Sequence, residues 1–286
     1  MSQPQSAEKV VLVTGASSGI GLASSIALAR AGWRVVATMR NLERSAALRD
    51  AAGQSGVDID LQPLDVTDEN SVGAIFDHLR TTYGRVDVVV NNAGAASVGT
   101  VETMPPADIR SAMEVNYFGV VAVTRAAMPF LRATRGHVVT ISSVGGVVGQ
   151  PFNEAYCAAK FAVEGFLESL SPVAKTVGVR VSLIEPGAVA SAFVENAQID
   201  QDASVADAGP YAQALKAYFA RTMQQFDPAS AQSPDQVAEL IVTHVADPEP
   251  AFRVQTSSLA TDFVKLKLSD LDGSRVTGMT ASWLGD

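Results

Sequence analysis

The fold is decided near the start of the chain by the stretch VVLVTGASSGIG, which runs from Val10 to Gly21. Its aliphatic start favours a buried strand, and the pattern from Gly19 to Ala31 favours a helix. The glycines between them permit positive φ angles and let the backbone approach a pyrophosphate closely. Free N–H groups at the start of the helix favour an anion. The candidate phosphate-binding residues are Gly15, Ser17, Ser18, Gly19, Ile20 and Gly21.

Outward from this stretch, β-branched runs alternate with helical patterns along most of the chain. The predicted strands are residues 9–13, 34–38, 59–62, 86–90, 137–142, 179–184 and 252–255, and the predicted helices are residues 19–31, 71–83, 107–134, 154–170 and 234–246. Such alternation indicates a parallel sheet with helices on both faces. We therefore expect an α/β fold, a single Rossmann-type domain with a doubly wound parallel sheet of about seven strands.

Two prolines interrupt the helical patterns. Pro129 lies within residues 107–134, where we expect it to end or kink a helix. Pro172 follows the pattern of residues 154–170, and Ser171 is suited to cap a short restarted turn. The sequence therefore predicts a break or a kink at Pro172 as well.

The domain organisation follows from where these patterns stop. Residues 1–8 are polar and predicted to form a disordered tail, and residues 9–260 form the predicted domain. Residues 188–232 are long for a connection in a compact domain and form a candidate substrate lid. Residues 261–286 form a C-terminal extension without a recognisable motif.

Composition limits the kinds of partner that the chain can have. Apolar residues make up 47% and charged residues 18% of the 286 residues, which is ample for a buried core. The net charge of −9 argues against nucleic acid as a partner. No apolar stretch reaches the length that spans a bilayer, and the first residues lack the pattern of a signal peptide. We expect a cytoplasmic protein with no membrane span.

The single cysteine and the three histidines carry little functional signal. Cys157 cannot form an intrachain disulfide, which suits a reducing compartment. It is either a redox switch or, as we favour, a small apolar filler. The histidines show no metal-ligand spacing, so no metal is expected; they are His78, His137 and His244.

The choice between dinucleotides depends on the end of the second predicted strand. An acidic residue there would bind the ribose 2′-hydroxyl and repel a 2′-phosphate. Here the strand ends Thr38-Met39-Arg40, without a carboxylate. Arg40 can offer a charge-assisted fork to a phosphate. The sequence therefore favours NADP(H) over NAD(H), with a solvated surface cation as the alternative for Arg40.

A candidate catalytic trio lies near the fifth predicted strand. Ser143 closes the strand, and Tyr156 and Lys160 follow it four residues apart, so that they share one face of a helix. An unperturbed phenol has a pKa of about 10, and a nearby ammonium favours its phenolate form. Tyr156 is thereby suited to general acid–base chemistry, with Ser143 holding a substrate oxygen.

Further motifs stand in order around this trio. NNAG at 91–94 ends the fourth predicted strand, NYFG at 116–119 lies in the next helical pattern, and PG at 186–187 follows the sixth strand. Together with the glycine-rich turn, they resemble the short-chain dehydrogenase/reductase family over about residues 9–190, with a weaker continuation to about residue 255. The resemblance implies an NADP(H)-dependent oxidoreductase, an alcohol dehydrogenase or carbonyl reductase.

The resemblance also implies a role for each matching position. Tyr156 is the implied general acid–base, Ser143 the anchor of the substrate oxygen, and Lys160 the residue that binds the nicotinamide ribose and lowers the tyrosine pKa. The backbone carbonyl of Asn116 is implied to hold a water that extends the proton relay, and Asp65 to contact adenine. The other implied cofactor contacts are Val66, Asn91, Ala93, Gly94, Pro186, Gly187, Val189 and Ser191, a serine where the family commonly has threonine. For residues 91–94, a purely structural role is the alternative.

Aromatic and aliphatic residues recur at helical spacing within the candidate lid. They are Tyr211, Leu215, Tyr218, Phe219, Met223 and Phe226. They form either a helix that packs on the core or a lid whose apolar face covers a hydrophobic substrate. The second interpretation predicts a bulky carbonyl or alcohol, such as a steroid-, retinoid- or polyketide-like compound.

Small residues along the predicted catalytic helix allow a second helix to approach closely. They are Ala158, Ala159, Ala162 and Gly165. In similar proteins this helix and the preceding long one form a dimer interface, so the resemblance implies a homodimer or homotetramer.

Three other functions are compatible with the same motifs. One is a 3-oxoacyl-thioester reductase, although the acidic surface argues against docking an acidic carrier. Another is an isomerase or dehydratase that holds its cofactor tightly. The third is a non-catalytic dinucleotide sensor, which has no need of the complete set Asn116, Ser143, Tyr156 and Lys160.

Overall fold

The computed structural model describes residues 8–191 and 199–284. In that part of the chain, seven parallel strands form one sheet in the order β3-β2-β1-β4-β5-β6-β7. The strands are β1 Val10–Val13, β2 Arg34–Met39, β3 Ile59–Pro63, β4 Val88–Asn91, β5 His137–Ile141, β6 Arg180–Glu185 and β7 Arg253–Gln255. The order reverses direction between β1 and β4, as in a doubly wound sheet. The predicted fold class is confirmed.

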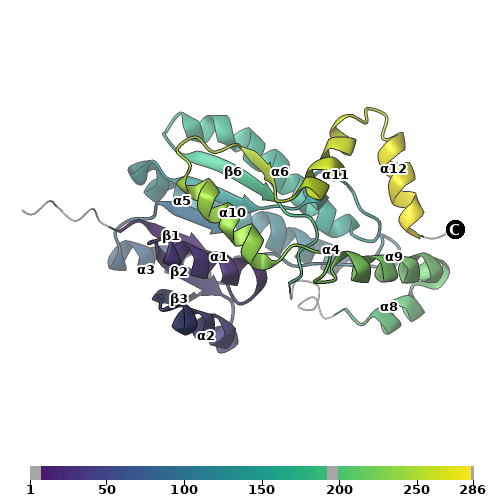
Figure 1. Cartoon of the computed structure of the whole chain (residues 1–286), viewed down its shortest axis with the longest axis horizontal. Coiled ribbons are helices and arrows are strands. Elements are labelled where there is room, and N and C mark those ends of the chain that lie inside the picture. Colours follow the sequence, from purple (N-terminus) through teal and green to yellow (C-terminus); the bar gives the residue numbers. More distant parts are fainter. Residues whose placement is uncertain (1–7, 192–198, 285–286) are drawn as a thin grey trace, which may run out of the picture.

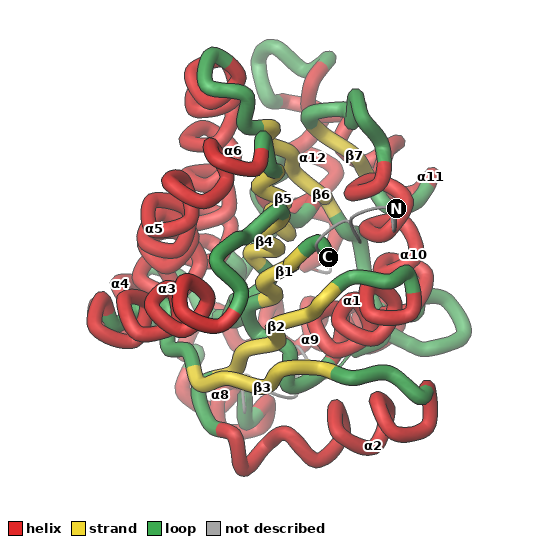
Figure 2. Tube along the Cα trace, turned by 90° about the vertical axis from the view of Figure 1, so that its left-hand side faces the viewer, coloured by secondary structure: helices red, strands yellow, loops and turns green. Residues whose placement is uncertain are grey.

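Helices cover both faces of this sheet (Figure 2). One face carries α1 Gly19–Arg30, α2 Ala46–Ser55 and α10 Pro234–Ala246, and the other carries α3 Glu69–Thr82, α4 Pro106–Met113, α5 Gly119–Thr134 and α6 Glu154–Lys175. Strand β1 shows why both faces are apolar. Val11 and Val13 pack in the core on the α1 side, whereas Val10 and Leu12 pack on the α5 side. Because side chains alternate along a strand, a continuous aliphatic run fills two cores at once.

Neither internal proline ends its helix. Helix α5 continues past Pro129 to Thr134, and α6 continues past Pro172 to Lys175. The expected end at Pro129 and the expected break at Pro172 are therefore wrong, and the kink expected as the alternative at each proline stays a prediction. Both rings lie on the exposed side of their helices, where water can bind the carbonyl that loses its N–H partner.

Four of the described helices gather at one end of the molecule (Figure 1). They are α8 Gln201–Asp207, α9 Ala212–Gln225, α11 Ser258–Leu268 and α12 Ser274–Ala281. Helix α9 agrees with the helical spacing of the apolar residues in the candidate lid, whereas α8, α11 and α12, like α2 on the sheet, are absent from the sequence prediction. Figure 1 shows α9 and α12 beyond the carboxyl ends of the strands. The 3₁₀ turn Ser282–Leu284, which follows α12, contacts α9. The candidate lid and the C-terminal extension thus meet on the side of the sheet where ligands bind.

Two sequence predictions concern residues outside this description. The predicted disordered tail lies outside the described residues except for Glu8, and so do residues 192–198 of the candidate lid. Among the helices that are described, none combines the length and the apolar character needed to cross a bilayer.

Replacing Pro172 tests the continuity of α6. We expect Pro172→Ala to raise the free energy of unfolding by about 1–3 kcal/mol, because alanine restores a backbone N–H in a helix interior. The proline ring is exposed, so little apolar contact is lost. Urea denaturation followed by circular dichroism measures the change. Pro129→Ala in α5 is the matched control and should shift stability in the same direction; a loss of stability in both variants contradicts the interpretation.

Candidate active site

The predicted site residues converge at the carboxyl ends of the strands. Register pairs place Asn91 beside Thr140 and Ile141 beside Ile184, so β4, β5 and β6 end at the same level. Ser143 follows β5 directly, and Val144 N–H donates to the carbonyl of Pro186 (2.9 Å) after β6. The loops after three neighbouring strands therefore share one edge of the sheet.

The glycine-rich turn is shaped by close approach of the backbone. Gly15 has a φ of +69°, and a Cβ there would lie 2.7 Å from Ala93 Cα. A Cβ on Gly21 would collide with the Asn92 amide and with the carbonyl of Gly15. Ser18, the N-cap of α1, makes no side-chain capping bond, and the first turn carries no acidic residue. This cradle fits the phosphates of a dinucleotide.

Asn92 holds the turn in place, a role that is not among the expectations from the sequence. Its side-chain amide donates to the carbonyls of Thr14 and Gly15, both at 2.9 Å. The Thr14 hydroxyl in turn accepts the backbone N–H groups of Asn92 and Ala93, both at 3.0 Å. Asn92 is the second asparagine of the NNAG motif, and that motif was the one sequence signal for its structural role.

Asn91, the first asparagine of that motif, serves the core. It is 2% exposed, and its side chain donates to Thr124 Oγ1 (3.1 Å) and Thr140 Oγ1 (3.2 Å). The side chain therefore joins β4 to β5 and α5. These contacts favour a structural role for the Asn91 side chain over a contact with the cofactor.

Asn116 lies in a π-helical turn, Glu114–Phe118, between α4 and α5. It is fully buried, and its amide donates to the carbonyls of Ala95 and Ala112 at 3.0 Å. A Cβ on Gly94 would lie 3.0 Å from Asn116 Oδ1 and 3.7 Å from Lys160 Nζ. Asn116 and Lys160 thus meet beside Gly94, and a π-turn at this point is typical of functional sites.

The predicted catalytic trio is brought together. A hydrogen bond from Ser143 lowers the pKa of Tyr156, so the two side chains are in contact. A Cβ on Gly145 would lie 3.3 Å from both Ser143 Oγ and Tyr156 Cε1. Lys160 Nζ is 5.9 Å from the tyrosine ring centroid and donates to the carbonyl of Ile141 at 2.9 Å. The three groups form one cluster at the end of β5.

Burial dominates the ionisation of this cluster. It raises the pKa of Tyr156, and the hydrogen bond from Ser143 opposes that rise only in part. Burial also lowers the pKa of Lys160 to about 8, while the charge of Glu164 raises it. The group that lowers the Tyr156 pKa in this structure is thus Ser143 and not Lys160, and the loss of water around the phenol outweighs it.

The other predicted cofactor residues lie in the segments that follow β1, β2, β3 and β6. Ser191 lies over the turn, 3.2 Å from where a Cβ on Gly19 would stand. Arg40 follows β2, is exposed, and makes no hydrogen bond or ion pair with the described residues. Asp65 Oδ1 accepts from the backbone N–H (2.9 Å) and hydroxyl (2.7 Å) of Thr67. Val66 and Val189 are buried. Ser17 and Gly187 sit in the turns that follow β1 and β6, and Ile20 lies in the first turn of α1.

Apolar walls flank the trio on two sides. The Val144, Val147 and Val148 side chains pack against α11 and α12. On the other side, Phe152 packs against Tyr218 of α9 with ring centroids 5.6 Å apart. The C-terminal extension and the candidate lid therefore both reach the chain segment between Ser143 and α6.

Phe152 has a backbone conformation that no sequence signal indicated. Its φ is +59°, in the left-handed region that a bulky side chain rarely adopts. Its carbonyl accepts the N–H of Gly99 (2.9 Å), and the next residue, Asn153, donates to the Tyr218 hydroxyl at 2.6 Å. The strain is of order 1–3 kcal/mol, and such strain clusters at ligand sites.

The histidines and the cysteine lie away from this chemistry. His137 and His244, far apart in the sequence, have ring centroids 5.6 Å apart at the opposite end of β5. Burial lowers the pKa of both, to about 3 for His137, so the pair is neutral at physiological pH. Burial raises the pKa of the Cys157 thiol to about 11. A buried, protonated thiol suits the apolar-filler interpretation.

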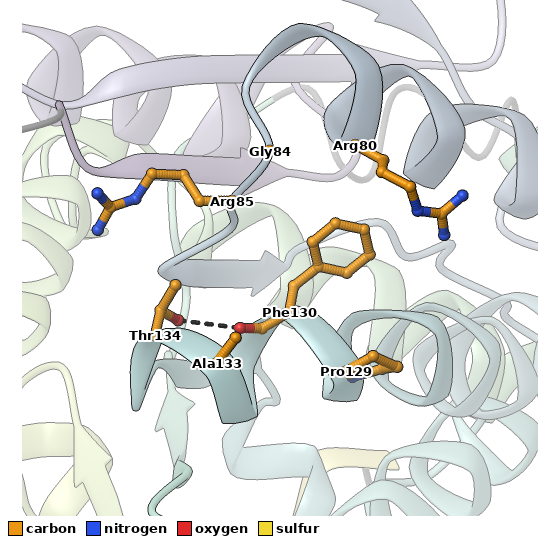
Figure 3. A pocket seen from close by; sticks show the side chains of 7 residues that line it. All are labelled: Arg80, Gly84, Arg85, Pro129, Phe130, Ala133 and Thr134. Atoms are coloured by element: carbon orange, nitrogen blue, oxygen red, sulfur yellow. Dashed lines mark hydrogen bonds between the residues drawn. The ribbon is translucent and has the colours of Figure 1, made fainter.

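A hollow of about 220 Å³ lies at the far end of the sheet and is separate from the candidate site (Figure 3). The Arg80 and Arg85 side chains point away from each other across it, and Thr134 bonds the Phe130 carbonyl (3.2 Å) beneath. Arg85 is paired with Asp87 at 2.7 Å. The hollow precedes β4 and β5, whereas the site follows them.

The fold and the site define a nucleotide-binding oxidoreductase of Rossmann type. The family model described as short chain dehydrogenase matches residues 9–202. The chain belongs to this short-chain dehydrogenase family, which confirms the resemblance found in the sequence.

Similar proteins agree with this assignment. The chain is 38% identical to human 17-beta-hydroxysteroid dehydrogenase type 1, with 98% of this chain and 87% of that protein covered. It is 37% identical to Retinol dehydrogenase 8 of Bos taurus, with 94% and 88% covered. A solved metagenomic short-chain oxidoreductase in complex with NADP has a TM-score of 0.68 and 27% identity, with 87% of this chain and 98% of that chain covered.

Proposed function

We propose that this protein is an NADP(H)-dependent oxidoreductase that interconverts an alcohol and a ketone or aldehyde, with Tyr156 as general acid–base. The observation that carries the proposal is the contact between Ser143 and Tyr156 at the end of β5, beside Lys160. A phenol and a hydroxyl that are in contact in a buried site can both form hydrogen bonds with one substrate oxygen.

The residues of the trio divide the work of carbonyl reduction. NADPH, when bound, supplies a hydride to the carbonyl carbon. Ser143 donates a hydrogen bond that holds the carbonyl oxygen, and Tyr156 gives its proton to that oxygen as the alcohol forms. Because burial raises the tyrosine pKa, the phenol keeps its proton at neutral pH and is ready to act as the acid.

Lys160 and Asn116 support this proton transfer. The Lys160 ammonium, fixed on the Ile141 carbonyl, favours the phenolate that remains after the proton has left. Asn116 packs beside it next to Gly94. We propose that a water on the Asn116 backbone carbonyl returns the proton from solvent.

The preference for NADP(H) rests on Arg40. It stands at the end of β2, where an acidic residue would select NAD(H), and its guanidinium has no partner among the described residues. A similar oxidoreductase was solved with NADP bound. The cradle between Gly15 and Gly21 would hold the pyrophosphate, and Asp65 at the end of β3 would contact the adenine.

The substrate that we propose is bulky and hydrophobic. Apolar walls from α9, α11 and α12 reach the segment that joins Ser143 to α6. The relatives include a steroid dehydrogenase and a retinol dehydrogenase. Both observations favour a steroid- or retinoid-like carbonyl over a small polar one.

We also propose that the protein is a homodimer or larger homo-oligomer. Small or apolar side chains remain outside on α6, where Ala158 and Gly165 are exposed and Phe161 is 40% exposed. Phe118, at the start of α5, is 49% exposed on the neighbouring element. Two such helices can pack against their copies in a second chain.

Removing the tyrosine hydroxyl tests the mechanism. We expect Tyr156→Phe to lower the turnover of a carbonyl substrate by at least about 10²-fold, because the proton donor is lost. The fall in NADPH absorbance measures turnover, and quenching of NADPH fluorescence checks that cofactor still binds. Tyr83→Phe, at the far end of α3, is the matched control. Full turnover by Tyr156→Phe would rule out the proposed mechanism, and absence of turnover in the wild type on every carbonyl would favour a dinucleotide sensor.

Reversing one charge tests the cofactor preference. We expect Arg40→Asp to lower kcat/KM with NADPH by about tenfold or more and to raise it with NADH, because a carboxylate repels the 2′-phosphate and binds the ribose hydroxyl. Arg132→Asp, exposed on α5, controls for net charge. Unchanged selectivity in the Arg40 variant would discard the assignment.

A panel of carbonyl compounds tests the substrate class. Steroid-like and retinoid-like ketones or aldehydes should show higher kcat/KM than small polar ones, since each buried methylene contributes about 0.8 kcal/mol. A 3-oxoacyl thioester in the same panel examines the alternative reductase function. Equal turnover of bulky and small compounds would contradict the interpretation of residues 188–232 as a lid that covers a hydrophobic substrate.

A further inference from the structure

Helix α6 carries a stripe of four ionisable side chains, of which the proposed mechanism uses two. Tyr156, Lys160, Glu164 and Glu168 follow one another at intervals of four residues, so adjacent members are neighbours on the helix. Lys160 is 4% exposed and Glu164 is 5% exposed, whereas the Glu168 side chain is 63% exposed. Glu164 is thus a buried carboxylate one helical turn from the catalytic ammonium, and such a group requires an explanation.

On its outer side, Glu164 is held by Arg253 of β7. Glu164 Oε2 accepts from Arg253 Nε (3.0 Å) and Nη2 (2.9 Å). The same guanidinium contacts Glu185 of β6 at 2.7 Å and Glu168 at 2.9 Å. A single cation therefore faces three carboxylates, two of which are buried.

On its inner side, Glu164 faces the segment that supports the catalytic serine. A Cβ on Gly146 would lie near both Ser142 Oγ (2.6 Å) and Glu164 Oε1 (3.2 Å). Lys160 Nζ binds the carbonyl of Ile141, the residue before Ser142. Glu164 therefore lies near Ser142, while Lys160 holds the preceding residue, and both positions come immediately before Ser143.

The buried charges of α6 act on one another electrostatically. Burial is the largest cause that lowers the pKa of Lys160, and Glu164 is the charge that raises it. Burial raises the pKa of Glu164, against the opposing effects of Ser142, Arg253 and Lys160. Burial, with the charge of Glu164, raises the pKa of Glu185 to about 7. Within the described residues, Arg253 is the only cation that forms an ion pair with both buried carboxylates.

We propose that Glu164 is a positioning residue of the catalytic site: held by Arg253, it keeps Lys160 in its ammonium form beside Tyr156. The geometry supports this through the one-turn spacing on α6, the burial of both groups, and the clamp from β7. The inference rests on the proposed function for its catalytic meaning, because the ammonium matters to turnover only if Tyr156 is the acid–base.

The direction of the pH effect follows from the sign of the shift. The folded pKa of Lys160 is about 8, below its ordinary value, so the ammonium is lost as the pH rises through that value. Removing the negative charge of Glu164 withdraws an interaction that favours the ammonium. The amine then forms at a lower pH, closer to neutrality.

Direct titration of Lys160 tests the inference without any need for turnover. The chain has six lysines, at positions 9, 160, 175, 216, 265 and 267, so ¹³C-lysine labelling gives a small set of side-chain signals, and Lys160→Arg assigns the one from Lys160. We expect Glu164→Gln to lower the Lys160 pKa by about one unit, which is about a tenfold change in the ratio of ammonium to amine.

Two variants separate this electrostatic role from a merely structural one. Glu185→Gln removes a buried carboxylate from the same Arg253 clamp, yet Glu185 is not among the charges that act on Lys160; its Lys160 signal should titrate as in the wild type. Glu164→Asp keeps the charge and should hold the Lys160 pKa closer to its wild-type value than Glu164→Gln does. An unchanged Lys160 pKa in Glu164→Gln, or an equal fall in Glu185→Gln, overturns the inference.

If Glu164→Gln does not fold, Arg253→Met and Glu185→Gln are added to it. The triple variant removes the cation together with both buried carboxylates that it faces, so no member of the cluster is left buried without its partner, which is the state that destabilises a protein most. The same fall in the Lys160 pKa is expected, and its absence overturns the inference.

The pH profile of carbonyl reduction supplies a second measurement. In Glu164→Gln, the loss of kcat on raising the pH should begin about one unit lower than in the wild type, while Glu185→Gln should keep the wild-type profile. Failure of the proposed function is recognised separately, since Tyr156→Phe would then retain turnover whatever the Lys160 signal shows.

Discussion

The rest of the site depends on the hydrogen bonds by which the Thr14 hydroxyl and the Asn92 side-chain amide join two loops. Together they make four hydrogen bonds between the loops that follow β1 and β4, at 2.9–3.0 Å. These two strands are neighbours where the strand order reverses, the place where ligands bind in sheets of this kind. Because these bonds join the two loops, they fix the conformation of the glycine-rich turn and the orientation of α1 behind it.

The sequence was sufficient to predict a structural feature wherever its local pattern agrees with the packing in the folded chain. The continuous aliphatic run of β1 fills both cores, and the four-residue spacing of Tyr156 and Lys160 places them together on α6. Position at a strand end also placed Ser143 correctly beside Tyr156. These features depend on the periods of strands and helices and on the parallel sheet, and short stretches of sequence carry that information.

Elsewhere, tertiary contacts decide what local pattern cannot. Helix α2 has one buried residue, Leu48, so no apolar stripe marks it. Pro129 and Pro172 stay within helices because they face solvent, which depends on how each helix packs. The strained backbone of Phe152 and the burial that raises the Tyr156 pKa are likewise products of the folded surroundings. The sequence predicts a role for the tyrosine but not its electrostatic surroundings.

The contact of α11 and α12 with the valines after Ser143 has a consequence for biosynthesis. A ribosome releases the glycine-rich turn well before these helices. The nascent chain therefore acquires the residues of the coenzyme cradle before it possesses the helices that pack against the segment after Ser143, and domains begin to fold during translation. The valine side chains of that segment stay uncovered until α11 and α12 have left the ribosome, and in this interval the region is most open to unwanted association.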